Sequence, residues 1–206
     1  MEALEKLHNY HDIVSIDCRN NYLKVLPSLP NSLQYLDCYN NKLTVFPRLP
    51  TGLTYLDCNC NKLEFLPNLP HSLSYFRCDN NNLKMLSRLP KSLTYLVCSQ
   101  NKLKVLPELP LSLEYLYCWG NLLSFLPILP KSLKYKDYSG NPVDTYIREK
   151  CGNNLTIYHR ECEQFATKLV NWYLDCRENP KFKFCRARLN RDYDALLKED
   201  MGGLMA

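Results

Sequence analysis

Cysteine is the residue type in this sequence with the widest chemical range. The 206 residues include eleven cysteines, and six of them follow one another at intervals of twenty residues. A thiol can act as a nucleophile or a metal ligand, and a buried thiol packs as a small apolar side chain. A strict interval places these six at one structural position, where neighbouring thiols point the same way and pair poorly as disulfides. We predict buried, reduced thiols at Cys18, Cys38, Cys58, Cys78, Cys98 and Cys118.

The other cysteines suggest two further kinds of chemistry. Cys60 falls on a predicted turn outside the regular series, so it is predicted to be the most reactive thiol. A zinc site is conceivable at a set near the C-terminal end, although this set contains no compact C-x-x-C pair. Three of its cysteines fit apolar helical stripes, so core packing is the favoured interpretation and no metal or cofactor is predicted. The set is Cys151, His159, Cys162, Cys176 and Cys185.

Catalytic motifs are missing from the rest of the sequence. It contains no HExxH, no glycine-rich phosphate loop and no recognisable pairing of a nucleophile with a base. Only six glycines are present, which is few for loops that must approach a phosphate closely. The sequence therefore predicts a protein that is not an enzyme.

A repeat of twenty residues governs most of the chain. Its unit is L-x-Y-L-x-C-x-x-N-x-L-x-x-L-P-x-L-P-x-S, and leucine begins six successive units from Leu33 onward. Each unit carries one asparagine after the Tyr-Leu-x-Cys segment, where the chain must turn. A buried asparagine can satisfy backbone N–H and C=O groups that a turn leaves unpaired. The predicted ladder comprises Asn21, Asn41, Asn61, Asn81, Asn101, Asn121 and Asn141.

Each unit divides into a strand and an extended return segment. Side chains alternate along the strand, so Leu36 and Cys38 should point inward while Tyr35 and Asp37 point outward. The return segment is Leu-Pro-x-Leu-Pro, whose prolines exclude a helix and favour polyproline II. Ser87 alone replaces the first of these prolines.

The segment L-x-x-L-x-C-x-x-N-x-L resembles the leucine-rich repeat, with cysteine in place of the third leucine. The Leu-Pro-x-Leu-Pro form resembles the short repeats of bacterial type III effectors. The tyrosine and cysteine positions look more like the repeat proteins of giant viruses, the nucleocytoplasmic large DNA viruses. These resemblances imply a solenoid with a parallel β-sheet on its concave face and a polyproline convex side.

Three regions are predicted along the chain. Residues 1–12 form an N-terminal cap, residues 13–141 hold seven copies of the repeat, and residues 142–206 form a helical C-terminal segment. Apolar positions from Thr156 to Glu178 have helical spacing, and so do those from Phe182 to Leu196. The break between them at Asn179-Pro180 predicts an α-helical hairpin.

The outward side chains of the strands are the predicted partner-binding surface. Tyrosine occupies one outward position in six copies, and a tyrosine column either binds a protein or simply stacks to stabilise the sheet. Specificity would come from the more variable outward positions, of which Val97, Tyr117 and Trp119 make an apolar cluster with Tyr115. The predicted partner-binding residues are Tyr35, Asp37, Tyr55, Asp57, Tyr75, Arg77, Tyr95, Val97, Tyr115, Tyr117, Trp119 and Tyr135.

Charge and hydropathy limit the classes of partner and the cellular locations that the sequence predicts. The net charge is +5, and lysine columns such as Lys42, Lys62 and Lys102 either keep the solenoid soluble or contact nucleic acid, which is the remoter alternative. No apolar run could span a bilayer and no signal peptide is apparent, so no membrane partner is predicted. We expect a protein that binds a host or viral protein in the host cytoplasm; the alternative is a structural component of a virion or its assembly.

Overall fold

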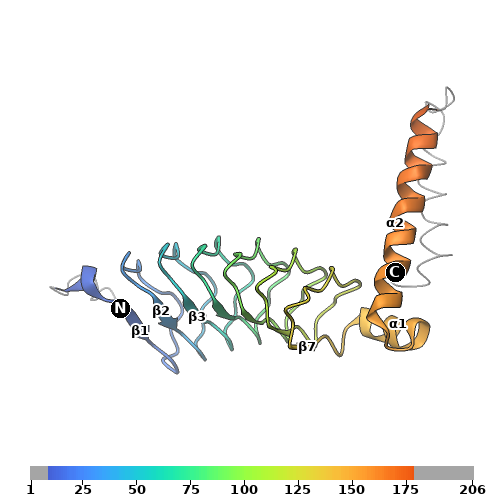
Figure 1. Ribbon diagram of the computed structural model, residues 1–206. Coiled ribbons are helices and arrows are strands. Elements are labelled where there is room, and N and C mark those ends of the chain that lie inside the picture. Colours follow the sequence, from blue (N-terminus) through green and yellow to red (C-terminus); the bar gives the residue numbers. More distant parts are fainter. Residues whose placement is uncertain (1–8, 179–206) are drawn as a thin grey trace. The chain divides into compact units, whose positions relative to one another are not determined.

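Seven short parallel strands lie side by side in the order of the sequence (Figure 1). The computed structural model describes residues 9–178, with side chains up to residue 171. Every neighbouring pair of strands is parallel and in register, with Tyr35 opposite Tyr55 and Leu36 opposite Leu56. The chain is therefore a leucine-rich-repeat solenoid with one turn per twenty residues. The strands are β1 Ser15–Asp17, β2 Tyr35–Asp37, β3 Tyr55–Asp57, β4 Tyr75–Arg77, β5 Tyr95–Val97, β6 Tyr115–Tyr117 and β7 Tyr135–Asp137.

Leucines fill the inside of each turn. In the second copy Leu33, Leu36 and Leu43 are fully buried, as is the thiol of Cys38. Stacked turns bury the same positions of their neighbours, so the core is one continuous column of apolar side chains. Burial of each such leucine stabilises the fold by about 1.5–3 kcal/mol relative to an exposed one.

The asparagine ladder is present and joins successive turns. The amide nitrogen of Asn61 donates to the carbonyl oxygens of Cys38, at 3.0 Å, and Cys58, at 3.1 Å. Its amide oxygen accepts the backbone N–H of Leu43 at 2.9 Å. One side chain thus satisfies backbone groups on its own turn and on the turn before it. The same pairing recurs at Asn41, Asn81, Asn101, Asn121 and Asn141.

Asn21 does not share this role, and its prediction as a buried member of the ladder is wrong. Its side chain is exposed and donates to the carbonyl of Arg19, two residues away, at 2.7 Å. The reason is positional, because β1 is the first strand of the sheet and no earlier turn offers a carbonyl there. The thiol of Cys18 is likewise only partly buried.

The residue before each ladder asparagine adopts a left-handed backbone. Its φ lies between 51° and 65° in every turn, a region that glycine and asparagine tolerate best. Cys60 and Gln100 occupy this position without that tolerance, at φ 53° and 51°. The residues are Asn20, Asn40, Cys60, Asn80, Gln100, Gly120 and Gly140.

The return segments are extended, with no helix in any turn, as their prolines predict. Each segment ends in a turn in which the N–H of Leu53, for example, donates to the carbonyl of Pro50 at 3.2 Å. A serine after that turn links it to the preceding one: Oγ of Ser72 lies 2.6 Å from the carbonyl oxygen of Leu53.

Two helices follow the solenoid, and the chain divides into compact units between Asn141 and Pro142. Helix α2, Leu155–Glu178, confirms the predicted helix over 156–178, and its first turn is capped by Asn154. Helix α1, Pro142–Cys151, was not predicted, although its proline at the first position is a helix-start signal. The predicted break at 179–180 and the second predicted helix lie outside the described residues.

Within the second unit, α1 and α2 contact each other. The Tyr146 hydroxyl lies 3.2 Å from Oε2 of Glu161. The rings of Tyr146 and Tyr158 meet edge to face, with centroids 6.2 Å apart. Of the predicted N-terminal cap, the structure describes a short 3₁₀ turn, Tyr10–Asp12, whose buried Tyr10 donates to the carbonyl of Ser28 at 2.8 Å.

Removal of a central ladder amide should destabilise the whole solenoid. In Asn101→Ala the N–H of Leu83 loses its acceptor inside the core, and the carbonyls of Cys78 and Cys98 each lose one of their two amide donors. We expect the free energy of unfolding to fall by about 3 kcal/mol, measured by urea denaturation. The matched control is Asn31→Ala at an exposed position, which should change it by less than about 0.5 kcal/mol. Equal effects of both substitutions would contradict the ladder's role.

Proline at residue 87 should stabilise the solenoid. Five other copies carry proline there, and the buried hydroxyl of Ser87 has no hydrogen-bond partner among the described residues. Ser87→Pro removes that hydroxyl and restricts the unfolded chain, so the free energy of unfolding should rise by about 0.5–1 kcal/mol. The midpoint of urea denaturation measures this, and a lower midpoint would show that residue 87 has left the backbone conformation of its equivalents.

Candidate protein-binding face

The tyrosines of successive strands stack on the concave face of the sheet. Ring centroids lie 4.2 Å apart between Tyr35 and Tyr55, 4.4 Å between Tyr55 and Tyr75, and 4.6 Å between Tyr75 and Tyr95. The three pairs of planes are within 14° of parallel. Because each ring covers the next, this part of the column presents ring edges and hydroxyls rather than ring faces.

The stacked hydroxyls remain protonated donors. Burial in the column raises the pKa of Tyr55, with a further contribution from its hydrogen bond to Tyr35. Burial also raises the pKa of Tyr75 and of Tyr95. This row of phenols therefore suits hydrogen bonding to a partner, not acid–base catalysis near neutral pH.

The stack changes character at β6. Tyr115 tilts by 43° relative to Tyr95, at a centroid distance of 5.6 Å. Tyr117, from the next outward position of the same strand, lies 5.9 Å from Tyr95 and stacks on Tyr135 at 4.9 Å. Side chains from two neighbouring columns are thus in contact at β6. We call these four tyrosines, together with Trp119 two residues after Tyr117 in the chain, the aromatic cluster: Tyr95, Tyr115, Tyr117, Trp119 and Tyr135.

Two members of the aromatic cluster are well exposed. Trp119 is 38% exposed and Tyr135 is 47% exposed, whereas the tyrosines of β2 to β6 are half-buried. Large apolar side chains on a rigid sheet offer contact area at low entropic cost. This part of the concave face therefore has the most accessible aromatic surface of the predicted binding residues.

Val97 does not belong to that surface, and its predicted exposure is wrong. The residue is only 9% exposed, because the register places it between Arg77 of β4 and Tyr117 of β6. These longer side chains stand on either side of it and cover it.

The acidic side chains predicted to face a partner are also buried. Asp37 and Asp57 are each 4% exposed. Each carboxylate accepts the backbone N–H two residues further on, from Tyr39 at 3.1 Å and from Asn59 at 3.0 Å. These aspartates stabilise the turn after the strand, which leaves them little surface to offer a ligand. An aspartate at the end of a strand, directly before a turn, is the sequence feature that indicates this bond to the turn backbone.

Arg77 joins the buried acids into one network. Its guanidinium lies 3.6 Å from Oδ2 of Asp57 and 3.4 Å from Oδ1 of Asp79. Burial raises the pKa of Asp57, while the N–H of Asn59 and the charge of Arg77 oppose that rise. The arginine therefore compensates charges on two turns and keeps part of its side chain, 34%, exposed beside the tyrosine column.

The thiols of the regular series are buried, as predicted, apart from Cys18. The thiol of Cys38 donates to the carbonyl of Asp57 on the next strand at 3.3 Å. Burial raises the pKa of Cys38 well above its ordinary value and that of Cys118 to about 12. These thiols are packed and protonated, so they are poor nucleophiles.

Cys60 lies on the turn and is partly exposed, but other cysteines are partly exposed too. Cys18 and Cys162 are partly exposed as well. Burial and the nearby carboxylate of Asp79 raise the pKa of Cys60, which reduces its thiolate fraction. Accessibility, rather than activation, is what sets Cys60 apart from the packed series.

The predicted alternative of a zinc set has two members in contact with other groups. The Cys151 thiol lies 3.4 Å from Oε2 of Glu161, and Cys162 is half-buried on α2. Among the side chains of residues 9–171, no three His, Cys, Asp or Glu gather as metal ligands. The side chain of Cys176 and all of Cys185 lie outside the described residues.

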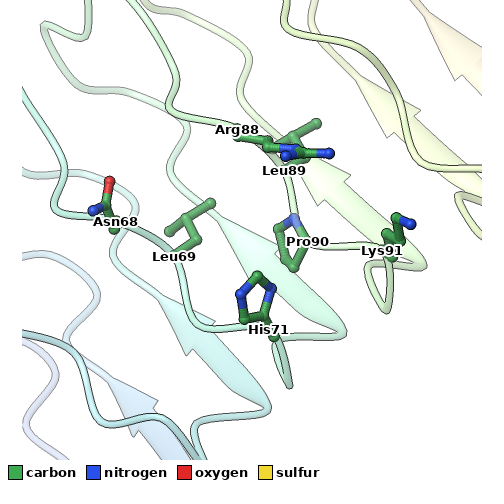
Figure 2. Close-up of a pocket in the computed structure, with 7 residues that line it drawn as sticks. All are labelled: Asn68, Leu69, His71, Arg88, Leu89, Pro90 and Lys91. Atoms are coloured by element: carbon green, nitrogen blue, oxygen red, sulfur yellow. The ribbon is translucent and has the colours of Figure 1, made fainter.

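A pocket of about 720 Å³ opens between two successive return segments, and no sequence motif indicated it. Figure 2 shows its polar and apolar side chains, contributed by residues 68–71 of one turn and 88–91 of the next. It brings together three basic groups and no nucleophile. The lining residues are Asn68, Leu69, His71, Arg88, Leu89, Pro90 and Lys91.

Thiol labelling should separate the accessible cysteines from the packed ones. A maleimide applied to the native chain should modify Cys60 before Cys38, Cys58, Cys78 or Cys98, which are fully buried. Because the thiolate reacts and the pKa of Cys60 is raised, its labelling rate should rise about tenfold per pH unit up to pH 9. Mass spectrometry of digests measures each site, with Cys60→Ser as control. Equal rates at Cys60 and Cys78 would contradict the burial.

Solved structures of bacterial effectors share this fold. The chain matches YopM from Yersinia enterocolitica with 40% identity and a TM-score of 0.63, covering 64% of this chain and 29% of that one. A YopM structure from Yersinia pestis, described as a leucine-rich effector protein, matches with 32% identity and a TM-score of 0.57, over 68% and 45% of the two chains. A Shigella effector LRR domain matches with 31% identity and a TM-score of 0.61, over 68% and 62%.

The chain thus spans less than two thirds of each of these structures. No protein-family model matches it, and neither does any curated protein. No helix within residues 9–178 is long and apolar enough to cross a membrane. The resemblance to giant-virus repeats remains a prediction, whereas the similarity to bacterial effectors is observed. By fold, the chain is a leucine-rich-repeat solenoid similar to those of Yersinia and Shigella effectors.

Proposed function

We propose that this chain is a protein-interaction module that binds a partner protein through the aromatic cluster on its concave face. The observation that carries the proposal is the merging of the tyrosine columns at β6. There Tyr117 stacks on Tyr135, and Trp119 follows Tyr117 by two residues; Trp119 and Tyr135 are both more than a third exposed.

Binding hot spots are enriched in tyrosine, tryptophan and arginine held in well-packed surroundings. The cluster fits this description because its strands are locked by the sheet register and by the asparagine ladder. Arg77 adds a partly exposed guanidinium further along the same face. A partner that buries the cluster would order few side chains, since the rings already pack on one another.

A host protein is the class of partner that the comparisons favour. Two of the similar structures are described as bacterial effector proteins, and this description is what favours a host partner. The likeness extends over 64% of this chain. Binding rather than catalysis is the proposed role, since burial raises the pKa of Cys58, Cys78 and Tyr55 and so keeps these groups protonated.

Truncation of two cluster side chains should weaken partner binding strongly. The double variant Tyr117→Ala/Trp119→Ala removes the exposed tryptophan and the ring that stacks on Tyr135. We expect the dissociation constant to rise by about two orders of magnitude, equivalent to about 3 kcal/mol. The partner is first captured from a host lysate, and its affinity is then measured with purified proteins by calorimetry.

The control is Phe65→Ala, which removes a single, 61% exposed aromatic ring that lies outside the strands. It should leave the affinity for that partner unchanged. An isolated partner that binds wild type and the double variant equally would refute the aromatic cluster as its site.

A further inference from the structure

An exposed apolar column runs along one flank of the solenoid, outside the strands. Its members occupy the same position in six successive turns, two residues after a fully buried leucine such as Leu43 or Leu63. Four of them are more than half exposed in the middle of the column, from 51% at Val105 to 61% at Phe65. The column is Val25, Val45, Phe65, Met85, Val105 and Phe125.

Lysines accompany the apolar column. They occupy the positions one and three residues before it, on either side of the buried leucine. The two positions hold six lysines and one acid, Glu64, whose carboxylate pairs with Lys84 at 3.1 Å. We call the apolar column and these lysines together the basic flank. The lysines are Lys24, Lys42, Lys62, Lys84, Lys102 and Lys104.

The ends of the basic flank are more apolar than its middle. Tyr22 and Leu122 occupy the position that Lys42, Lys62 and Lys102 hold in other turns, and they are 76% and 50% exposed. The ammonium of Lys42 lies 4.9 Å from the centre of the Tyr22 ring. Hydrophobic surface therefore continues along the whole flank without interruption by acids other than Glu64.

The fold aligns these side chains in one row. Neighbouring turns pair in register, and strands are spaced by about 4.8 Å, so six turns place the column along about 24 Å. Each member is fixed by the buried leucine beside it and by bonds such as Lys62 N–H to the Leu43 carbonyl, at 2.9 Å. The exposed side chains of such a row can contact an extended surface simultaneously.

We propose that the basic flank binds the surface of an anionic lipid bilayer. Apolar tips flanked by lysines match the acyl boundary and the negative headgroups of such a surface. A second copy of the chain is a poor occupant, because two lysine-rich flanks would face each other. Nucleic acid would leave the aliphatic Val25, Val45, Met85 and Val105 without a favourable contact, since bases stack on aromatic rings.

That no helix within residues 9–178 could span a membrane does not bear on this mode of binding. The prediction that the chain has no membrane partner rested on its lack of a long apolar run, which excludes a spanning segment alone. A peripheral protein needs only a surface that combines apolar contact with cationic charge. The basic flank and the concave aromatic cluster are separate surfaces, so one chain could dock on a membrane and still hold a protein.

Vesicle binding by the full chain tests the proposal. Flotation with vesicles of about 30% phosphatidylserine in phosphatidylcholine should carry the chain upward, and pure phosphatidylcholine should not. Raising the salt from about 0.1 M to about 0.5 M should reduce the bound fraction, because the Debye length shortens.

Two variants separate the apolar and the charged contributions. The triple substitution Val45→Ser/Phe65→Ser/Val105→Ser should lower the affinity for anionic vesicles at least about tenfold, and Lys42→Glu/Lys62→Glu/Lys102→Glu should lower it further. All six residues are exposed, so both variants should keep the wild-type unfolding midpoint by circular dichroism. The control Tyr117→Ala/Trp119→Ala, on the concave face, should bind vesicles as wild type does.

Three results would overturn the proposal. The first is no flotation of the wild-type chain with anionic vesicles. The second is flotation that the serine variant leaves unchanged, which would mean that charge alone attracts the chain to lipid. The third is salt-sensitive capture on immobilised polyglutamate without any vesicle binding, which would assign the basic flank to an acidic protein. Each result is independent of whether the aromatic cluster binds its own partner.

Discussion

Every turn of the solenoid bends sharply after its strand, and from the second turn onward one asparagine per turn satisfies backbone groups that these bends leave unpaired. The amide of Asn81 holds carbonyls of two successive turns, Cys58 and Cys78, and accepts the N–H of Leu63. Because each amide needs a carbonyl from the preceding turn, adjacent turns must stay in register. The register then places like side chains beside like, both on the sheet and on the flanks.

This alignment has opposite consequences for different residue types. Tyrosines gain from it, since rings 4.2–4.6 Å apart stack and cover one another. Thiols gain as well, because each can donate to a carbonyl of the next strand while it packs in the core. Like charges repel when the register places them side by side. On the concave face this repulsion is reduced because Arg77 pairs with both Asp57 and Asp79. Recognition of a specific partner therefore depends on surface positions where the residue type differs from that of the neighbouring turns.

The sequence predicted the solenoid because a twenty-residue period fixes the fold without knowledge of long-range contacts. The strands, the extended return segments and the amides from Asn41 to Asn141 all follow from that period. Exposure on the concave face could not be predicted equally well. Whether Asp37 or Val97 is accessible depends on the size of the side chains that the register places next to it, and on bonds to the following turn. Helix α1 was missed although Pro142 marked its start, since the short segment lies directly after the last repeat.

The two candidate surfaces differ in how they relate to the repeat. The aromatic cluster exists because β6 departs from its neighbours: Tyr117 occupies a position that is aspartate in β1, β2 and β3, and the tyrosine stack tilts as a result. A departure at one place defines a localised site, which suits one specific protein partner. The basic flank exists because six turns repeat the same apolar position with little change, which defines a line rather than a site. A row of equivalent apolar side chains cannot distinguish one folded ligand from another. It can bind a surface that is itself uniform, and a lipid bilayer is such a surface.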